Sequence, residues 1–170
     1  MFTQYSFCSF CGQPFAAQQA WPRVCASCGN ITFLNPIPVA VVLLPVDEGV
    51  LAVRRNIEPQ IGRLALPGGY INRDESWQQA GARELFEETG ITISPEDIRE
   101  FRVKSTPDYR TLLVFGLAQL LQSHDLPAFT PNEETQEVCV LTAPQELAFS
   151  THTEALREYF DWRSKKGLTP

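Results

Sequence analysis

The chain has 170 residues, with 14 Lys and Arg against 20 Asp and Glu, which gives it a formal charge of −6 at pH 7. Hydrophobic residues make up 44% of the sequence and charged residues 20%, which favours a domain with a buried apolar core and excludes general disorder. The acidic balance disfavours nucleic acid and anionic membrane surfaces as partners, because both repel a negatively charged protein surface.

The N-terminal end carries none of the features of a secretory signal. Residues 1–5 have neither a basic start nor a following apolar stretch. The longest apolar run, around Val39 to Leu44, is far shorter than the roughly 20 residues that a membrane-spanning helix needs. We therefore expect a protein of the cytoplasm, where cysteines stay reduced and disulfides do not persist.

Four of the five cysteines form two Cys-x2-Cys pairs that are separated by 13 residues. They are Cys8, Cys11, Cys25 and Cys28. Gly12 and Gly29 follow the pairs, at positions where a tight turn needs a backbone conformation that other residues resist. Four thiolates favour a closed, structural Zn²⁺ site, and the spacing resembles a zinc ribbon. Two disulfides or unrelated core thiols are the alternatives, and Cys139 is expected to pack in the core.

A break follows the cysteine pairs at residues 35–38, where two prolines interrupt the chain. Each proline lacks an amide donor and drives the residue before it toward extended geometry. We therefore expect a zinc ribbon over residues 1–35 and a larger domain over residues 36–170. Metal binding would supply much of the folding free energy of the ribbon, because about thirty residues cannot build an apolar core alone.

The larger domain begins with predicted strands. Residues 39–46 and 50–54 are rich in β-branched side chains and are joined by a short turn, which indicates a β-hairpin. Further strands are predicted at residues 91–93, 98–104, 111–121 and 135–141.

Two helices are predicted among these strands. The first covers residues 75–89, with Asp74 as its N-terminal cap and Gly90 at its end. The second covers residues 153–162, with an aromatic stripe at helical spacing that is expected to face the core. The stripe consists of Leu156, Tyr159 and Phe160. The order of elements favours an α/β fold with a mixed sheet between helices.

The first helix carries the residues that indicate chemistry. At about 100° per residue, the side chains of Glu84, Glu87 and Glu88 share one narrow arc of the helix. Three carboxylates on one face repel one another, so a cation is needed to offset their charge. Oxygen ligands without a nearby His or Cys favour Mg²⁺ or Mn²⁺.

From Gly69 to Ile91 every fixed position matches the pattern G-x5-E-x7-R-E-U-x-E-E-x-G-U, in which U is an aliphatic residue. This stretch resembles the Nudix box. A solvated acidic helix, the alternative, explains three glutamates but neither the preceding glycines nor the offset Glu75 and Arg83. The resemblance implies an α/β/α sandwich with a mixed sheet and hydrolysis of a nucleoside diphosphate linked to a further group.

The resemblance also implies a role for each matched position. The metal ligands would be Glu84, Glu87 and Glu88, with the Gly68 carbonyl as a further candidate. Glu75 would support the site, and Arg83 would orient the carboxylate of Glu84. The family often adds a later acidic residue as ligand or base, and Glu134 is the preferred candidate, with a solvated loop as the alternative.

A zinc ribbon before a Nudix domain resembles two subgroups, the NADH pyrophosphatases and enzymes associated with ADP-ribose and FAD. The segment Ser105–Tyr109 lacks the Gln and Trp of the NADH pyrophosphatase motif, so the second subgroup fits better, including residues 146–149. We expect a small ADP-linked substrate and release of AMP. Cleavage of a nucleotide cap on RNA and a catalytically silent nucleotide sensor are the alternatives, and the ribbon is compatible with a homodimer.

The remaining aromatic and histidine side chains carry weaker signals. Phe33, Tyr70 and Tyr109 could stack on a base, but packing within the fold is the preferred interpretation. His124 and His152 are expected to be surface or capping residues.

Overall fold

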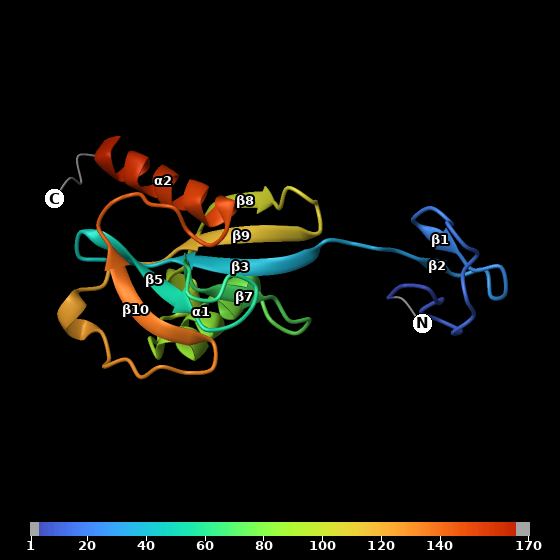
Figure 1. The fold of residues 1–170 in the computed structure, drawn as a ribbon, viewed down its shortest axis with the longest axis horizontal. Helices are drawn as coiled ribbons and strands as arrows, with labels where there is room; N and C mark the ends of the chain where they lie inside the picture. Colours follow the sequence, from blue (N-terminus) through green and yellow to red (C-terminus); the bar gives the residue numbers. More distant parts are fainter. Residues whose placement is uncertain (1–3, 166–170) are drawn as a thin grey trace. The chain divides into compact units, whose positions relative to one another are not determined.

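The computed structural model describes residues 4–165 and divides the chain into two compact units, Met1–Pro36 and Ile37–Pro170 (Figure 1). None of the helices formed by the described residues is long and apolar enough to cross a membrane.

The N-terminal unit is built from two turns of the same construction. In one, the Gly12 N–H donates to the Cys8 carbonyl oxygen at 3.0 Å, and in the other the Gly29 N–H donates to the Cys25 carbonyl oxygen at 2.9 Å. The two glycines have φ angles of 73° and 74°. This left-handed conformation is costly for residues with a Cβ atom, which confirms the expected role of both glycines.

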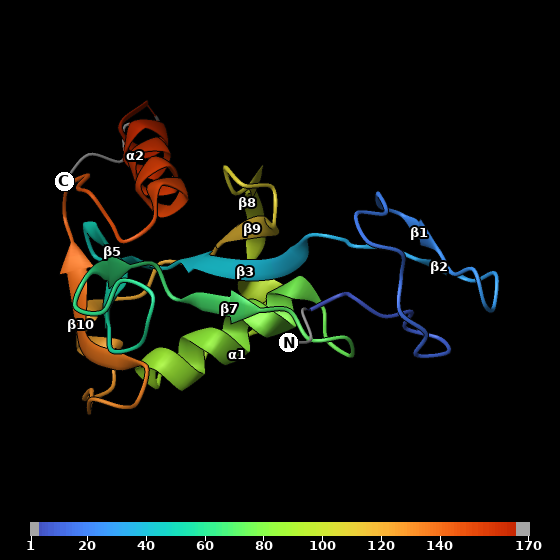
Figure 2. The same ribbon diagram turned by 45° about the vertical axis from the view of Figure 1, so that its right-hand side comes forward.

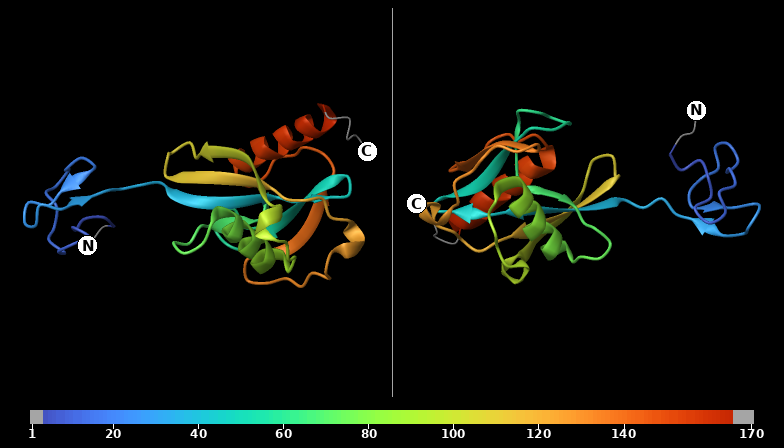
Figure 3. Two further views of the ribbon diagram at one scale, coloured as in Figure 1. Left: turned by 180° about the vertical axis from the view of Figure 1, so that it is seen from behind. Right: turned by 90° about the horizontal axis from the view of Figure 1, so that it is seen from below.

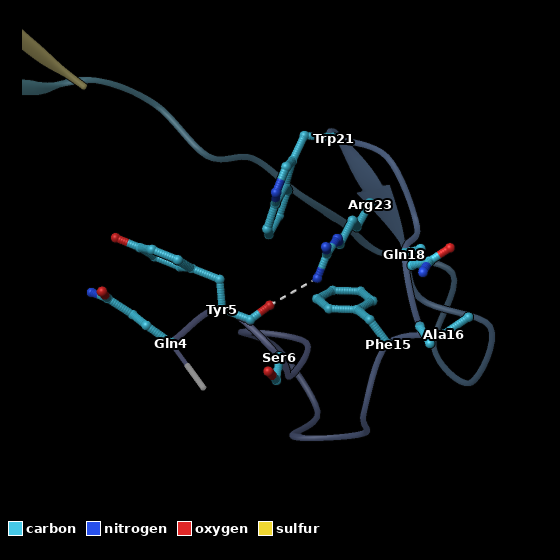
Figure 4. A pocket seen from close by; sticks show the side chains of 9 residues that line it. Gln4, Tyr5, Ser6, Phe15, Ala16, Gln18, Trp21 and Arg23 are labelled. Atoms are coloured by element: carbon cyan, nitrogen blue, oxygen red, sulfur yellow. Dashed lines mark hydrogen bonds between the residues drawn. The ribbon is translucent and has the colours of Figure 1, made fainter. Parts of the chain in front are cut away.

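Arg23 organises the aromatic side chains of this unit. Its guanidinium lies 4.2 Å from the ring centroid of Trp21 and 5.5 Å from that of Phe15. Figure 4 shows the three side chains beside one another. It also donates a hydrogen bond to the carbonyl oxygen of Tyr5 at 3.1 Å. Arg23 is the first residue of strand β1 (Arg23–Val24), which pairs antiparallel with β2 (Ile31–Thr32).

The C-terminal unit contains two sheets and two helices. One sheet has the strand order β7-β3-β9-β8, and the other has the order β10-β5-β4, with β6 also paired to β5. The strands are β3 (Ile37–Leu43), β4 (Pro45–Val46), β5 (Gly49–Arg55), β6 (Leu64–Ala65), β7 (Gly68–Tyr70), β8 (Arg99–Ser105), β9 (Thr111–Leu117) and β10 (Thr135–Leu141). The α-helices are α1 (Trp77–Thr89) and α2 (Ser150–Lys165), and short 3-10 helices cover Pro95–Asp97 and Ser123–Asp125. Strands β3 and β9 are parallel and the other pairs are antiparallel, so the sheet is mixed as predicted.

Successive residues of β3 point into two separate cores. Val41 packs into the core beneath α2, which contains Leu156 and Tyr159 of that helix, whereas Val42 packs into the core beneath α1, which contains Leu85. This alternation follows from the pleat of a strand whose two faces are both covered. Figures 2 and 3 show α2 and α1 on opposite sides of β3 and β9. The predicted α/β/α sandwich is confirmed, and so is the core position of the α2 stripe.

Several element predictions need correction. The hairpin prediction is wrong for most of its length, because only β4 pairs with β5 while β3 belongs to the other sheet. Residues 91–93 form no strand; Ile91 is buried against α1 instead of pairing in a sheet. Helix α1 begins at Trp77 with Ser76 as its cap, not Asp74, and α2 begins at Ser150.

Candidate functional site

Two glycines make room for the site on β7. This strand runs antiparallel to β3, and a Cβ atom on Gly68 would lie only 2.3 Å from the carbonyl oxygen of Ala40. A Cβ atom on Gly69 would lie 2.4 Å from the carboxylate carbon of Glu84. Glycine at both positions therefore allows the two strands to approach and leaves space for the Glu84 carboxylate against β7.

Helix α1 presents its acidic side chains toward these glycines. The Ser76 hydroxyl accepts a hydrogen bond from the Gln79 N–H at 3.2 Å, and the Gln79 side chain accepts the Ser76 N–H at 2.8 Å, which forms a capping box. The helix ends at Gly90, with φ of 76°. Leu85 is fully buried in the core beneath α1, so the helix is anchored on one face and carries Glu84 and Glu88 on another.

Glu88 is the most enclosed carboxylate of the site, with 6% of its surface exposed. One of its oxygens accepts a hydrogen bond from the Gly68 N–H at 3.1 Å. Burial raises the pKa of Glu88 to about 8, and the nearby charges of Glu84 and Glu134 add to the effect. The group is therefore placed where a positive charge would stabilise its ionised form.

Arg83 connects four groups around the glutamates. Its guanidinium donates to Glu75 at 2.7 and 3.1 Å, to Glu84 at 2.8 Å and to Glu87 at 2.9 Å, and also to the Tyr70 carbonyl oxygen at 2.9 Å. These bonds lower the pKa of Glu75 to about 2. Burial raises the pKa of Glu84 despite this partner. Arg83 therefore orients Glu84 by a direct bond.

The loop before β10 brings a further carboxylate to the site. Asn132 fixes this loop, because its Oδ1 accepts the N–H groups of Glu134 and Thr135 at 2.9 and 2.8 Å. Its Nδ2 donates to the Glu87 carbonyl oxygen at the end of α1, at 3.0 Å. Asn132 was not predicted as a site residue, and an Asn two residues before the candidate acid is the pattern that could have indicated it.

These groups surround one cavity of about 680 Å³. Four glutamates line it: Glu84, Glu88 and Glu134, with Gly68 among the lining residues, and Glu58 from the loop after β5. Glu87 is not among the described residues that line it, because its side chain is 52% exposed and bonded to Arg83. Glu75, Arg83 and Glu87 thus form an ion-pair cluster that reaches the cavity through Glu84.

Apolar side chains form another part of the lining, which we call the apolar wall. It consists of Val41, Leu66, Leu113, Phe149 and His152. Arg55 also lines the cavity, and its guanidinium lies 5.2 Å from the ring centroid of Phe149. Carboxylates and apolar groups in one cavity suit a ligand with a charged part and a flat, weakly polar part.

Two groups of side chains lie elsewhere than expected. His152 is neither a surface nor a capping residue, because it is 6% exposed and its Nδ1 accepts the Leu66 N–H at 3.2 Å. Phe33, Tyr70 and Tyr109 do not pack inside the fold but are exposed, and Tyr70 lines the cavity. His124 is exposed as expected.

The oxygen donors around the cavity fit a hard divalent cation. Three carboxylates and a backbone carbonyl are the ligands that Mg²⁺ and Mn²⁺ prefer. The raised pKa values of Glu84 and Glu88 reflect carboxylates crowded together at a buried site, a charge that such a cation would offset.

Comparison with known proteins identifies the family. A model of the NUDIX domain matches residues 35–163 of the chain. The chain belongs to the family of Nudix hydrolases. The Nudix box accordingly occupies β7, the loop after it and α1, which carries Glu84 and Glu88 of the cavity.

Relatives with known names or structures agree with this assignment. The chain is 33% identical over 118 residues to the NAD-capped RNA hydrolase NudC of Edwardsiella ictaluri, a match that covers 69% of this chain and 45% of that protein. The chain thus spans less than half the length of this curated relative. A NUDIX hydrolase from Nitrosomonas europaea has a similar crystal structure, with a TM-score of 0.77, 29% identity and coverage of 94% of this chain and 93% of that one.

A second similar structure is a bifunctional NMN adenylyltransferase/ADP ribose pyrophosphatase from Francisella tularensis, complexed with AMP and an Mn ion. It has a TM-score of 0.58 and 25% identity, over 79% of this chain and 42% of that chain.

The second metal candidate lies in the N-terminal unit, outside the Nudix domain. The sulfurs of Cys8, Cys11, Cys25 and Cys28 all lie within 4.8 Å of one another. Hydrogen bonding, chiefly from the Cys11 backbone, lowers the pKa of the Cys8 thiol to about 6, and the Asn30 backbone and side chain lower that of Cys28. The clustered sulfurs fit a tetrahedral Zn²⁺ site.

Proposed function

We propose that this Nudix hydrolase is a pyrophosphohydrolase that depends on a divalent metal, cleaves the diphosphate of a small ADP-linked molecule and releases AMP. ADP-ribose, FAD and NADH are the candidate substrates. The observation that carries this proposal is the gathering of Glu84, Glu88 and Glu134 around a cavity that also has an apolar wall.

The metal ligands in this proposal are the box glutamates and their neighbours. They are Glu84, Glu87, Glu88, Glu134 and the Gly68 carbonyl. When bound, Mg²⁺ or Mn²⁺ would supply a positive charge that attracts the diphosphate and stabilises the negative charge that develops on the leaving phosphate. Glu87 would have to exchange its bond with Arg83 for the metal.

The chain's own side chains would prepare the reaction. Arg83 holds Glu84 in place, and Asn132 holds the loop of Glu134 against the end of α1. Glu134 is our candidate for the group that accepts the proton of the attacking water, or for a further ligand. The apolar wall would exclude water from the rest of the substrate.

A small molecule is favoured over capped RNA as the substrate. The curated relative is named an NAD-capped RNA hydrolase, and an NAD cap is itself an ADP-linked diphosphate. However, Arg23 is the one charged residue among residues 1–36, and the whole chain carries a formal charge of −6. Binding of an RNA chain requires basic side chains along the phosphates.

The four cysteines are proposed to hold one structural Zn²⁺ in a ribbon over residues 1–35, before a Nudix domain over residues 36–170. A reducing compartment such as the cytoplasm suits this site, because oxidation of the thiols competes with zinc. The ribbon is also compatible with a homodimer. Measurement of the molar mass of the protein in solution would test this.

The test is turnover against a panel of ADP-ribose, FAD, NADH, NAD, nucleoside triphosphates and an RNA oligonucleotide with an NAD cap. Phosphate release after addition of phosphatase is measured with Mg²⁺ or Mn²⁺. We expect AMP from one ADP-linked small molecule and none without the metal. Tight binding of a panel member without turnover would contradict the proposal and indicate a nucleotide sensor.

A further inference from the structure

His152 stands in the first turn of α2 and forms part of the apolar wall. Its ring lies between two phenylalanines, with ring centroids 5.7 Å from Phe115 and 5.1 Å from Phe149, both in edge-to-face geometry. Its Nδ1 accepts the N–H of Leu66 at 3.2 Å. These contacts fix the orientation of the imidazole in the cavity lining.

The hydrogen bond to Leu66 determines which ring nitrogen carries the proton. A nitrogen that accepts an N–H is unprotonated, so the proton of the neutral imidazole lies on Nε2. Protonation of both nitrogens would break the Leu66 bond in a buried site. Burial, with a smaller effect from the charge of Arg55, lowers the pKa of His152 to about 3. His152 is therefore a neutral donor at working pH.

The Nε2–H group has no hydrogen-bond partner among residues 4–165, whereas Nδ1 is bonded to the Leu66 N–H. Among residues 4–165, Thr135 Oγ1 is the one enclosed side-chain oxygen or nitrogen that lacks a hydrogen bond. Nε2 of His152 has no bonding partner in that part of the chain either, yet it is not one of the enclosed atoms. His152 is one of the residues that line the cavity, so this donor lies within reach of a ligand held there. A donor in this position is available to a ligand.

We propose that the Nε2–H of His152 recognises the purine base of the substrate by donating to one of its ring nitrogens. This inference rests on the proposed function, since it assumes a purine nucleotide in the cavity. It assigns to His152 a role in choosing the substrate, separate from the carboxylates that act on the diphosphate.

The surroundings favour a base over a phosphate as the acceptor. A phosphate is bound best by a charged donor, and His152 cannot become charged without losing its bond to Leu66. Arg55, which also lines the cavity, is the cation suited to an anion. The flat faces of a purine instead match Leu113 and Phe149, and its ring nitrogens are neutral acceptors.

A sugar fits this wall less well than a base. A ribose carries several hydroxyl groups that each need a partner, and the five side chains of the apolar wall offer one donor, that of His152; the hydroxyl-bearing residues of the cavity, Thr106, Thr111, Ser150 and Thr151, are not part of this wall. An unpaired hydroxyl against such a wall would lose its hydrogen bonds to water.

The first test uses the unsubstituted chain of 170 residues. Binding of AMP is measured by calorimetry with Mg²⁺, together with 1-deaza-, 3-deaza- and 7-deaza-AMP, in which one ring nitrogen is replaced by carbon. We expect one analogue to bind about tenfold more weakly than AMP, and the other two to bind like AMP. Equal binding of all three would overturn the inference.

Substitution then identifies the donor. In His152→Phe the difference between AMP and the weak analogue should vanish, whereas His152→Gln, which offers both an acceptor and a donor, should retain part of it. His124→Phe, at an exposed histidine, is the matched control and should behave like the unsubstituted protein. A difference that persists in both His152 variants would assign the recognition to another donor.

The two proposals fail in different ways. Turnover of an ADP-linked molecule together with equal binding of all analogues would remove the role of His152 and leave the proposed function standing. Absence of both turnover and AMP binding would remove the proposed function and this inference with it. If His152→Phe does not fold, the analogue series and His152→Gln still decide the question.

Discussion

Glu88 is buried at the end of α1, where the Gly68 N–H is the donor that bonds to its carboxylate. Its pKa of about 8 in the folded protein lies above the value of about 4.3 expected in the unfolded chain. Between these two pH values the folded state binds more protons than the unfolded state. Without a metal, the free energy of unfolding therefore falls as pH rises through this window.

Replacing Glu88 should consequently separate stability from activity. We expect Glu88→Gln to raise the free energy of unfolding at pH 7 by on the order of 1–3 kcal/mol in protein without added Mg²⁺, because Gln removes the cost of protonating a carboxyl that is ionised in the unfolded chain. The same variant should lose turnover by at least about 100-fold with Mg²⁺. Thermal unfolding and steady-state kinetics measure the two effects, with exposed Glu133→Gln as control. A less stable or fully active variant would contradict this account.

Glu87 offers a sharper test of the ligand set, because it is exposed and bonded to Arg83. Glu87→Gln should leave the fold intact, as judged by an unchanged circular dichroism spectrum. If Glu87 binds the metal during turnover, we expect the variant to lose activity strongly, by about tenfold or more. Unchanged activity with Mg²⁺ would exclude Glu87 from the ligands.

The spacing of the box predicted three carboxylates on one face of the helix, and two of them reach the cavity. The position of the third, Glu87, could not be predicted from the sequence. Its carboxylate bonds to the guanidinium of Arg83, which also bonds to Glu75, and the sequence does not indicate how one guanidinium is divided among several carboxylates. His152 was missed for a related reason. Its partner, the Leu66 N–H, lies 86 residues away in the chain, and only the fold brings them together.

At the scale of elements, the start of α1 depends on which of two capping residues is used. Ser76 forms the capping box with Gln79, whereas Asp74 is exposed in the loop before it. We expect Ser76→Ala to lower the free energy of unfolding by about 1 kcal/mol. Asp74→Ala is the matched control and should have little effect. Urea unfolding measures the free energy of unfolding of both variants. A larger loss in Asp74→Ala than in Ser76→Ala would identify Asp74 as the capping residue.

The strands and helices were predicted best where local pattern decides the structure. Strand β10 was predicted with its observed bounds, and the end of α1 at Gly90 follows from the left-handed conformation of a glycine. The pairing of strands was predicted worst. Residues 39–46 form one apolar run, and nothing local indicates that β3 pairs with β9 while β4 turns back on β5. The paired strands β3 and β9 are distant in sequence, so their pairing cannot be predicted from a local pattern.

At the scale of the whole molecule, charge is divided unequally between the two units. Residues 1–36 carry Arg23 alone, and all 20 Asp and Glu lie in the rest of the chain. The N-terminal unit therefore has few ion pairs available to stabilise it, and its side-chain order rests on the Arg23 aromatic contacts and on the four cysteines. Loss of a bound metal should affect this unit far more than the sheets of the other.

Cys25→Ser should therefore abolish zinc retention, while Cys139→Ser, the matched control in β10, should leave it at one ion per chain. Zinc content of the purified variants measures the effect. Hydrogen exchange should show loss of protection in residues 4–36 of Cys25→Ser and unchanged protection in α1 and α2. Zinc retained by Cys25→Ser would contradict the four-cysteine site.

The bond between Leu66 and His152 ties the loop before β7 to the first turn of α2. The cavity thus draws Glu84 and Glu88 from α1, and Phe149 and His152 from around the start of α2, about sixty residues further along the chain. Mutation can alter one segment without disturbing the other. A lineage that kept the Nudix box while varying residues 148–152 would keep its chemistry and acquire new substrates, so divergence among such enzymes should be greatest at the beginning of the last helix.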